Sequence, residues 1–144
     1  MAIDVLISDE FKLGKTNNTK FVDFPFLNEV QFELLLDFVE YVSNDKALLG
    51  KNKPSWLDDN LDIISDTESY QAFNFWHYHC GEFDPNVPIR ALTYQLKLNL
   101  DGLTSAAVIH YRKLSETEIV IVGYSPIHVP FPKEDDPENP LFGD

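Results

Sequence analysis

The four histidines have the clearest capacity for chemistry in this chain, and all of them lie between residues 77 and 128. His77 and His79 stand two apart in a stretch with the alternation of a β-strand, so their side chains should share one face. His110 falls in a later predicted strand, and His128 follows the last one. A curled antiparallel sheet could bring three of these rings together. Because histidine titrates near neutral pH, such a cluster would suit proton transfer.

Three interpretations of the histidines stay open at this point. The first is structural: the rings pack or hydrogen-bond within a sheet, beside Trp76, Tyr78 and Tyr111. The second is an acid–base set for RNA cleavage, in which Arg112 and Lys113 would stabilise the negative charge that develops on phosphorus. The third is a zinc site, since a His-x-His pair with one further histidine is compatible with zinc ligation.

Other chemical motifs are missing from the sequence. It has no glycine-rich phosphate loop, no G-x-S-x-G elbow and no C-x-x-C pair. Its one cysteine, Cys80, excludes an internal disulfide and argues against a cysteine nucleophile. A single cysteine fits a reducing compartment, and the N-terminus lacks the pattern of a secretory signal. We therefore expect a cytoplasmic protein without a cofactor, and no apolar run reaches the roughly 18 residues of a membrane span.

The net charge constrains function most strongly. The 144 residues include 24 acidic and 11 basic side chains, which give a formal charge of −13 at pH 7. Acids concentrate in residues 54–70 and 129–144, whereas residues 71–128 are nearly neutral, with 4 basic and 5 acidic side chains. A protein that binds nucleic acid usually presents a basic patch. Any RNA site in this chain must therefore be small, with the acids elsewhere.

One helix has clear start and stop signals. Asn28 and Gln31 have the spacing of a capping box, which predicts a helix that begins there and stops near Gly50. The predicted buried stripe is Leu27, Val30, Leu34, Phe38 and Tyr41, and the predicted acidic stripe is Glu29, Glu33, Asp37 and Glu40. A second, short helix is expected to begin at Pro54.

Outside the predicted helices, apolar and polar residues alternate with the two-residue period of β-strands. Strands are predicted over residues 3–7, 73–80, 92–100, 105–113 and 118–124, the last four as an antiparallel meander. Helices and strands together predict an α+β protein. We expect a single domain over residues 1–132 and an acidic, proline-containing tail over residues 133–144.

Three stretches of the sequence together resemble the YafO family of toxins, within the RelE-like group of toxin–antitoxin systems. They are Phe75 to His79 with its His-x-His pair, Thr104 to Tyr111, and Ile119 to His128, which ends in Pro-x-His. The similarity covers about residues 28–128. The resemblance implies a RelE-like α+β fold, with N-terminal helices packed on a curled antiparallel sheet. It also implies an endoribonuclease that cuts mRNA on the ribosome and is neutralised by a cognate antitoxin protein.

The resemblance and the charges together give the expected site. His77, His79, Tyr111 and His128 fall on pattern positions of the family, and we add Arg112 and Lys113 from their charge and location. We expect His79 or His110 to act as the base toward the ribose 2′-hydroxyl, and His128 to protonate the leaving 5′-oxygen. Arg112 and Lys113 would hold the phosphate, and Trp76 and Tyr111 would stack on bases. The predicted catalytic residues are thus His79, His110, Tyr111, Arg112 and His128, the predicted substrate-binding residues are Trp76, His77 and Lys113, and no metal is expected.

The chain also departs from this family pattern, which keeps a second function open. RelE-like toxins are usually basic, whereas this chain is strongly acidic, and Leu103 stands where a basic residue is expected before Thr104. An acidic immunity or inhibitor protein would instead neutralise a basic nuclease or other toxin by covering its nucleic-acid site. Its binding surface would be the acids at positions 29, 33, 37, 40, 58, 59 and 62.

Overall fold

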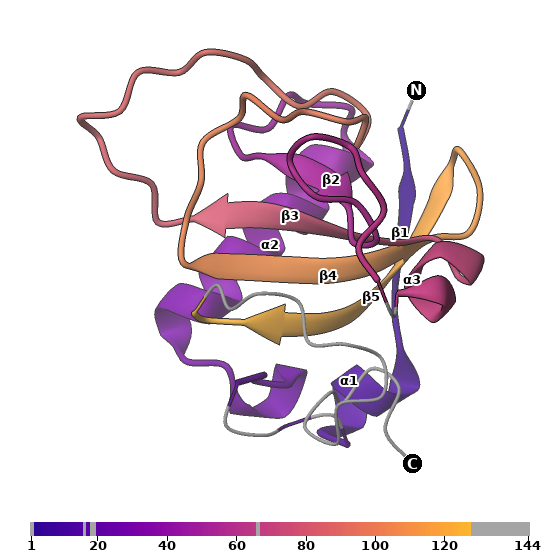
Figure 1. The fold of residues 1–144 in the computed structure, drawn as a ribbon. Helices are drawn as coiled ribbons and strands as arrows, with labels where there is room; N and C mark the ends of the chain where they lie inside the picture. The colour runs from indigo at the N-terminus through magenta and orange to yellow at the C-terminus, as the bar shows by residue number, and fades with distance from the viewer. Residues whose placement is uncertain (1, 16, 18–19, 66, 128–144) are drawn as a thin grey trace.

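One five-stranded sheet organises the chain (Figure 1). The computed structural model describes residues 2–15, 17, 20–65 and 67–127. The strands are β1 (Asp4–Ile7), β2 (Asn52–Pro54), β3 (Phe75–Gly81), β4 (Ala107–Lys113) and β5 (Glu118–Ser125). Their order in the sheet is β1-β5-β4-β3-β2, and β1 pairs in parallel with β5, whereas the other neighbours are antiparallel.

The expected α+β class is confirmed, but the expectation of a wholly antiparallel sheet is wrong. The exception is β1, which pairs with β5 from Asp4 opposite Glu118 to Ile7 opposite Ile121. Parallel neighbours need a long crossover connection. Here the whole chain between the first and the last strand supplies that connection, so the sheet is mixed.

The main helix, α2 (Glu29–Ser43), begins as predicted. The backbone N–H of Gln31 donates to Asn28 Oδ1 and the backbone N–H of Asn28 donates to Gln31 Oε1, both at 2.9 Å. The helix ends at Ser43 rather than near Gly50, because Asn44 already donates through its side chain to the Glu40 carbonyl, at 2.8 Å. The other helical segments are short: α1 (Asp9–Leu13), the 3-10 turn η1 (Phe24–Phe26) and α3 (Glu68–Ala72).

The buried side of α2 matches the predicted stripe only in part: Phe38 is buried, and Leu27 and Leu34 pack partly buried against the core as expected. Leu35, Phe38 and Val42 are the buried side chains of this helix, whereas Val30 is 48% and Tyr41 39% exposed. The helix contacts the sheet along the line of residues 35, 38 and 42, which is rotated from the predicted stripe. The predicted acidic stripe is exposed along its whole length: Glu29, Glu33, Asp37 and Glu40.

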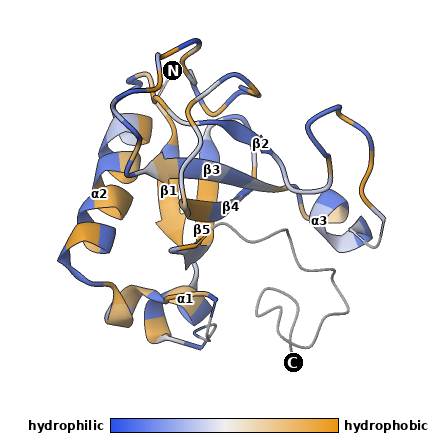
Figure 2. Cartoon of the chain, turned by 60° about the vertical axis from the view of Figure 1, so that its left-hand side comes forward, coloured by the Kyte–Doolittle hydropathy of each residue, from blue (hydrophilic) through white to orange (hydrophobic). Residues whose placement is uncertain are grey.

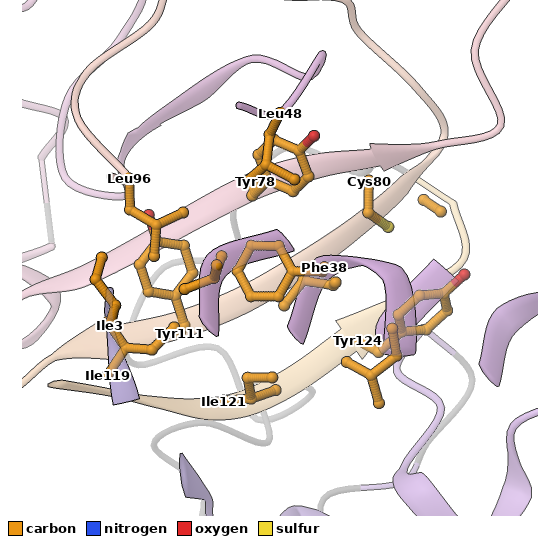
Figure 3. Packing of buried hydrophobic residues seen from close by; sticks show 14 of the residues in the cluster. Ile3, Phe38, Leu48, Tyr78, Cys80, Leu96, Tyr111, Ile119, Ile121 and Tyr124 are labelled. Atoms are coloured by element: carbon orange, nitrogen blue, oxygen red, sulfur yellow. The ribbon is translucent and has the colours of Figure 1, made fainter. Parts of the chain in front are cut away.

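The core lies between α2 and one face of the sheet (Figure 3). The Phe38 ring lies 5.3 Å from the Tyr78 ring and 5.9 Å from the Tyr111 ring, measured between centres. Ile109 of β4 and Ile121 of β5 are fully buried in the same cluster. We call this side of the sheet the helix face, and the opposite side, which carries His77, His79 and His110, the histidine face.

The histidine face is covered by irregular chain. Residues 55–65 and α3 lie on this side, and α2 lies on the other (Figures 1 and 2). The predicted helix beginning at Pro54 is not formed. The Asp58 side chain accepts from the backbone N–H groups of Asn60 and Asp62, at 2.8 and 3.0 Å. Such local side-chain bonds favour a turn over a helix.

The predicted strand over residues 92–100 is also wrong. Its buried side chains are Thr93, Leu96 and Asn99, three apart rather than two, and Gln95 and Leu96 have left-handed φ angles of 51° and 54°. These residues instead make single bridges to the chain at and before β2, such as Leu48 with Thr93 and Asn52 with Asn99. Residues 93–103 thereby cover an edge strand whose polar backbone groups would otherwise lack partners.

In the part of the chain that the structure describes, no helix is long and apolar enough to cross a membrane. The expected boundary between a domain over residues 1–132 and a tail over residues 133–144 falls outside the described residues.

Candidate functional site: a histidine–lysine cleft

Two histidines of β3 share the histidine face, as the alternation predicts. His77 and His79 are 2% and 4% exposed, and Tyr78 between them points into the core. Their ring centres lie 5.9 Å apart. The strand therefore fixes two titratable groups side by side on a rigid element.

Two lysines from the edge strand join these histidines. Lys53 is the cross-strand partner of His77, and the Lys51 carbonyl accepts from the His79 N–H at 2.9 Å. Directly opposed residues in a sheet point to the same side. The two lysine side chains and the two histidine side chains therefore lie on the same face of the sheet and line one cleft.

Together these side chains line a cleft of about 900 Å³. Its floor is formed by residues of β2 and β3. Its walls are residues 57–60 on one side and residues 104–106, just before β4, on the other. The cleft is thus built from three separate parts of the chain, residues 51–64, 77–79 and 104–106.

Asp59 is the third charged partner in the cleft. Its Oδ1 atom lies 2.7 Å from the Nζ of Lys51 and 2.7 Å from the Nζ of Lys53. The lysine side chains are 11% and 14% exposed, whereas that of Asp59 is 65% exposed. Hydrogen bonds from Lys51 and then from Lys53 lower the pKa of Asp59 to about 2.

Each histidine of the cleft is held through Nδ1. For His77 the partner is the hydroxyl of Ser55, at 3.1 Å, on a side chain with no exposed surface. For His79 the Nδ1 atom lies 3.0 Å from the carbonyl oxygen and 3.1 Å from the amide nitrogen of Ser105. A protonated Nδ1 donates to that carbonyl, and an unprotonated Nδ1 accepts from that N–H. The backbone of Ser105 therefore accommodates either protonation state of His79.

A glycine immediately before Lys51 sets the close approach of β2 to β3. A Cβ atom at Gly50 would collide with the carbonyl oxygen of His79 and would meet the Tyr78 ring at 2.8 Å. The Gly50 N–H donates to the Tyr78 hydroxyl at 2.9 Å, and its carbonyl accepts from Thr93 Oγ1 at 2.7 Å. These contacts fix the backbone from which Lys51 projects.

His110 lies next to the cleft without lining it. It is the cross-strand partner of His77, and the two ring centres are 6.4 Å apart. Its Nε2 atom lies 2.9 Å from Ser125 Oγ, and the Phe21 ring packs on it with a centre distance of 5.3 Å. His110 is thus a neighbour that packs against His77 rather than a member of the open site.

Tyr111 and Arg112 lie away from the cleft. Tyr111 is fully buried on the helix face, where its hydroxyl donates to Asn52 Oδ1 at 2.7 Å, and burial raises its pKa. Neighbouring strand residues point to opposite faces, so Tyr111 cannot share a site with His110. Arg112 lies near the start of β3, where its guanidinium is 5.1 Å from the Phe73 ring centre and Nε donates to the Phe73 carbonyl at 3.1 Å.

Trp76 and Lys113 form a separate pair. Trp76 packs against the core cluster, and the Lys113 ammonium lies 3.6 Å from the centre of its ring. Burial lowers the pKa of Lys113 to about 8. The structure thus does not bring Trp76, Tyr111, Arg112 or Lys113 to the histidines of the cleft. His128 lies outside the described residues.

Metal ligation is not supported by the arrangement of the three described histidines. Among residues 2–15, 17, 20–65 and 67–127, no group of three or more His, Cys, Asp or Glu side chains could hold a metal ion. His77, His79 and His110 are neighbours along and across strands, and the partners described above fix their rings by hydrogen bonds and packing. The zinc interpretation therefore has no ligand set in this part of the chain.

The predicted RNA site lacks several residues of the cleft, among them Lys51, Lys53, Ser55, Asp59 and Ser105, although Asp59 belongs to the acidic surface predicted for an inhibitor. One local signal points to two of them, because the alternation Lys-Asn-Lys directly before Pro54 is that of a short edge strand. The pairing of that strand with β3 involves residues more than twenty positions apart, and no local pattern predicts it.

Comparison of the chain with protein-family models, with curated proteins and with solved structures found no match. The fold and the site still define a class. It is an α+β protein with a mixed five-stranded sheet, whose main helix covers one face and whose other face carries a histidine–lysine cleft.

Proposed function

We propose that this protein is an endoribonuclease of the RelE-like type, a YafO-like toxin of a toxin–antitoxin system, and that the histidine–lysine cleft is its RNA site. The observation that carries the proposal is His79, which has a backbone partner in either protonation state and lies beside two lysines in an open cleft. The packing of α2 on one face of the sheet supports a RelE-like arrangement. The proposal includes a cytoplasmic location, mRNA on the ribosome as substrate, and a cognate antitoxin as partner.

The proposed reaction is cleavage of a phosphodiester by its own 2′-hydroxyl. His79 takes the 2′-hydroxyl proton while the 2′-oxygen bonds to phosphorus and the bond to the 5′-oxygen breaks. A protonated His77, 5.9 Å from His79 between ring centres, donates its proton to the leaving 5′-oxygen, and His128 is the alternative donor. Lys51 and Lys53 take the role predicted for Arg112 and Lys113, because positive charge stabilises the phosphorane. The products are a 2′,3′-cyclic phosphate and a 5′-hydroxyl.

The test is RNA cleavage by the purified full chain, on free RNA and on translating ribosomes. His79→Gln, which retains hydrogen-bonding groups near Ser105, should lower the cleavage rate at least about 100-fold, the usual contribution of an acid–base group. Lys53→Met should also lower it. Lys12→Met removes the same charge from the exposed side of α1 and should leave the rate unchanged. A folded wild-type protein that cleaves neither substrate, and whose induction does not arrest growth, would refute the proposal.

A second candidate function rests on a different surface. The exposed acids of α2, together with Asp58, Asp59 and Asp62, support an acidic immunity or inhibitor protein that binds a basic toxin. Glu33→Gln with Asp37→Gln should then weaken capture of a basic nuclease, whereas His79→Gln should not. The opposite result, sensitivity to His79 alone, favours the endoribonuclease.

A further inference from the structure

The two lysines of the cleft converge on a single point. Both Nζ atoms lie 2.7 Å from the same oxygen, Asp59 Oδ1. Each lysine stem is largely buried, and the backbone beneath is held on both sides: Lys51 donates to the Leu103 carbonyl at 2.8 Å and accepts from the His79 N–H at 2.9 Å. The pair is therefore a fixed receptor for one negatively charged oxygen.

The acid that occupies this receptor is held much less firmly. The Asp59 side chain is 65% exposed and belongs to a loop outside any helix or strand. The loop makes its own bonds, since Asp58 accepts from Asn60 and Asp62 and the Ile64 N–H donates to the Trp56 carbonyl at 2.9 Å. None of these bonds involves the Asp59 carboxylate, so another anion can replace that carboxylate without breaking them. Ion pairs with an exposed partner contribute little to the free energy of folding, so replacing the Asp59 carboxylate by another anion costs little free energy.

We propose that Lys51 and Lys53 form a binding site for one phosphate group of an RNA backbone, and that Asp59 occupies this site in the free protein as an internal competitor. The identity of the ligand as RNA rests on the proposed function. The site itself is carried by the convergence of the two ammonium groups. His77 lies directly opposite Lys53 in the sheet, so a phosphate bound here lies beside the proposed acid–base pair.

The lysine pair suits an anion with two free oxygens. Asp59 engages both ammonium groups through a single oxygen, Oδ1, and Asp58, the other acid of the cleft, accepts from backbone N–H groups of its own loop instead. A phosphodiester presents two unesterified oxygens, so each ammonium can take its own oxygen. A competitor on the lysine pair of the cleft also keeps unrelated anions out.

Two probes test the site without requiring catalysis: inorganic phosphate, and a short RNA with 2′-O-methyl groups, which cannot be cleaved through a 2′-hydroxyl. Asp59→Asn should bind both about fivefold more tightly than the wild type, the factor expected when an exposed ion pair no longer competes. Asp62→Asn is the matched control, because it removes the same charge from the same loop without touching either lysine, and it should change affinity less than twofold. Lys53→Met should abolish phosphate binding.

A second measurement keeps the proposal testable should a variant fold poorly. In the wild-type protein, bound phosphate should release Asp59 from the lysines, so the pKa of its carboxyl, followed by NMR, should rise from about 2 toward the ordinary value near 4. Equal affinity in Asp59→Asn, Asp62→Asn and wild type, or an unchanged Asp59 pKa at saturating phosphate, would overturn the proposal. Phosphate binding without RNA cleavage would leave the site standing and refute only the endoribonuclease.

Discussion

At the scale of single residues, Asn52 connects the helix face of the sheet to the irregular chain along its edge. Its side chain is fully buried, accepts from the Tyr111 hydroxyl at 2.7 Å and donates to the carbonyls of Leu96 and Lys97 at 3.0 and 3.1 Å. The tyrosine expected to be catalytic is thus a structural partner of β2. It helps to hold the short strand from which the cleft lysines project.

Removal of either partner should therefore affect stability more than chemistry. Asn52→Ala leaves three buried polar groups unpaired and should lower the free energy of unfolding by at least about 2 kcal/mol. Tyr111→Phe removes one bond and should cost about 1 kcal/mol, with cleavage of RNA by the folded fraction unchanged. Urea unfolding with a parallel cleavage assay measures both. A large loss of cleavage in stably folded Tyr111→Phe would place the hydroxyl in the chemistry after all.

Asp59 gives the fold a measurable acid sensitivity. Its folded-state pKa of about 2 lies below the ordinary value of 3.8 for an aspartate. The ion pairs therefore contribute stability above about pH 4, and this contribution is lost as the pH falls from about 4 to 2. Because the side chain is 65% exposed, solvent screening limits the contribution to less than about 1 kcal/mol. Wild type and Asp59→Asn should differ in urea unfolding at pH 7 and converge near pH 2, whereas Asp62→Asn should follow wild type throughout.

At the scale of elements, the placement of β2 against β3 depends on Gly50. A side chain there would collide with the backbone of His79, which cannot move without breaking the pairing of β3. Gly50→Ala should thus destabilise the protein by about 2 kcal/mol or more and weaken phosphate binding, because Lys51 follows directly. Leu49→Ala, at a 38% exposed neighbour, should have a smaller effect on both. Wild-type stability and phosphate affinity in Gly50→Ala would contradict this role.

Local patterns predicted the elements whose causes are local. The capping box located the start of α2, and strict alternation placed His77 and His79 on one face, since both depend only on residues a few positions apart. The same alternation separates His110 from Tyr111, so the expectation that both belong to one site conflicted with a rule already available in the sequence. The leucine alternation over residues 92–100 failed because backbone bridges to Leu48 and Asn52 decide that conformation.

The lysine pair could not be predicted in this way. Lys53 lies in a three-residue strand and Lys51 directly before it, so their local alternation indicates a short edge strand but not its partner, and Asp59 reaches them from a loop. Arg112 and Lys113 are stronger candidates from charge and order alone, because they lie in a longer, clearer strand. Long-range pairing of β2 with β3 decided between the two sets.

At the scale of the whole molecule, the acids of α2 are separated from the lysine pair, whereas Asp58 and Asp59 line the cleft itself. The acids of α2 lie on the outside of the helix, beyond the helix face, whereas the lysine pair lies in the cleft on the histidine face. Charges separated by more than about 8–10 Å are largely screened at physiological salt. The strongly acidic composition therefore limits the size of an RNA footprint without excluding contact with one phosphate in the cleft.

This separation predicts that the affinity for RNA depends only weakly on salt concentration. Single-stranded RNA releases about 0.7 counterions for each phosphate contact. Because both lysines of the cleft hold the same phosphate, the slope of log affinity against log salt for the 2′-O-methyl RNA should be no steeper than about −0.7. Lys53→Met should bring the slope toward zero, while Lys12→Met should leave it unchanged. A slope of about −4 or steeper would require several further cations and would place the RNA on another surface. The inhibitor alternative predicts the opposite result: no RNA binding, and a steep slope for binding of a basic protein partner. Salt screens the attraction between complementary charges across such an interface, so this outcome would make the exposed acids of α2 the binding surface.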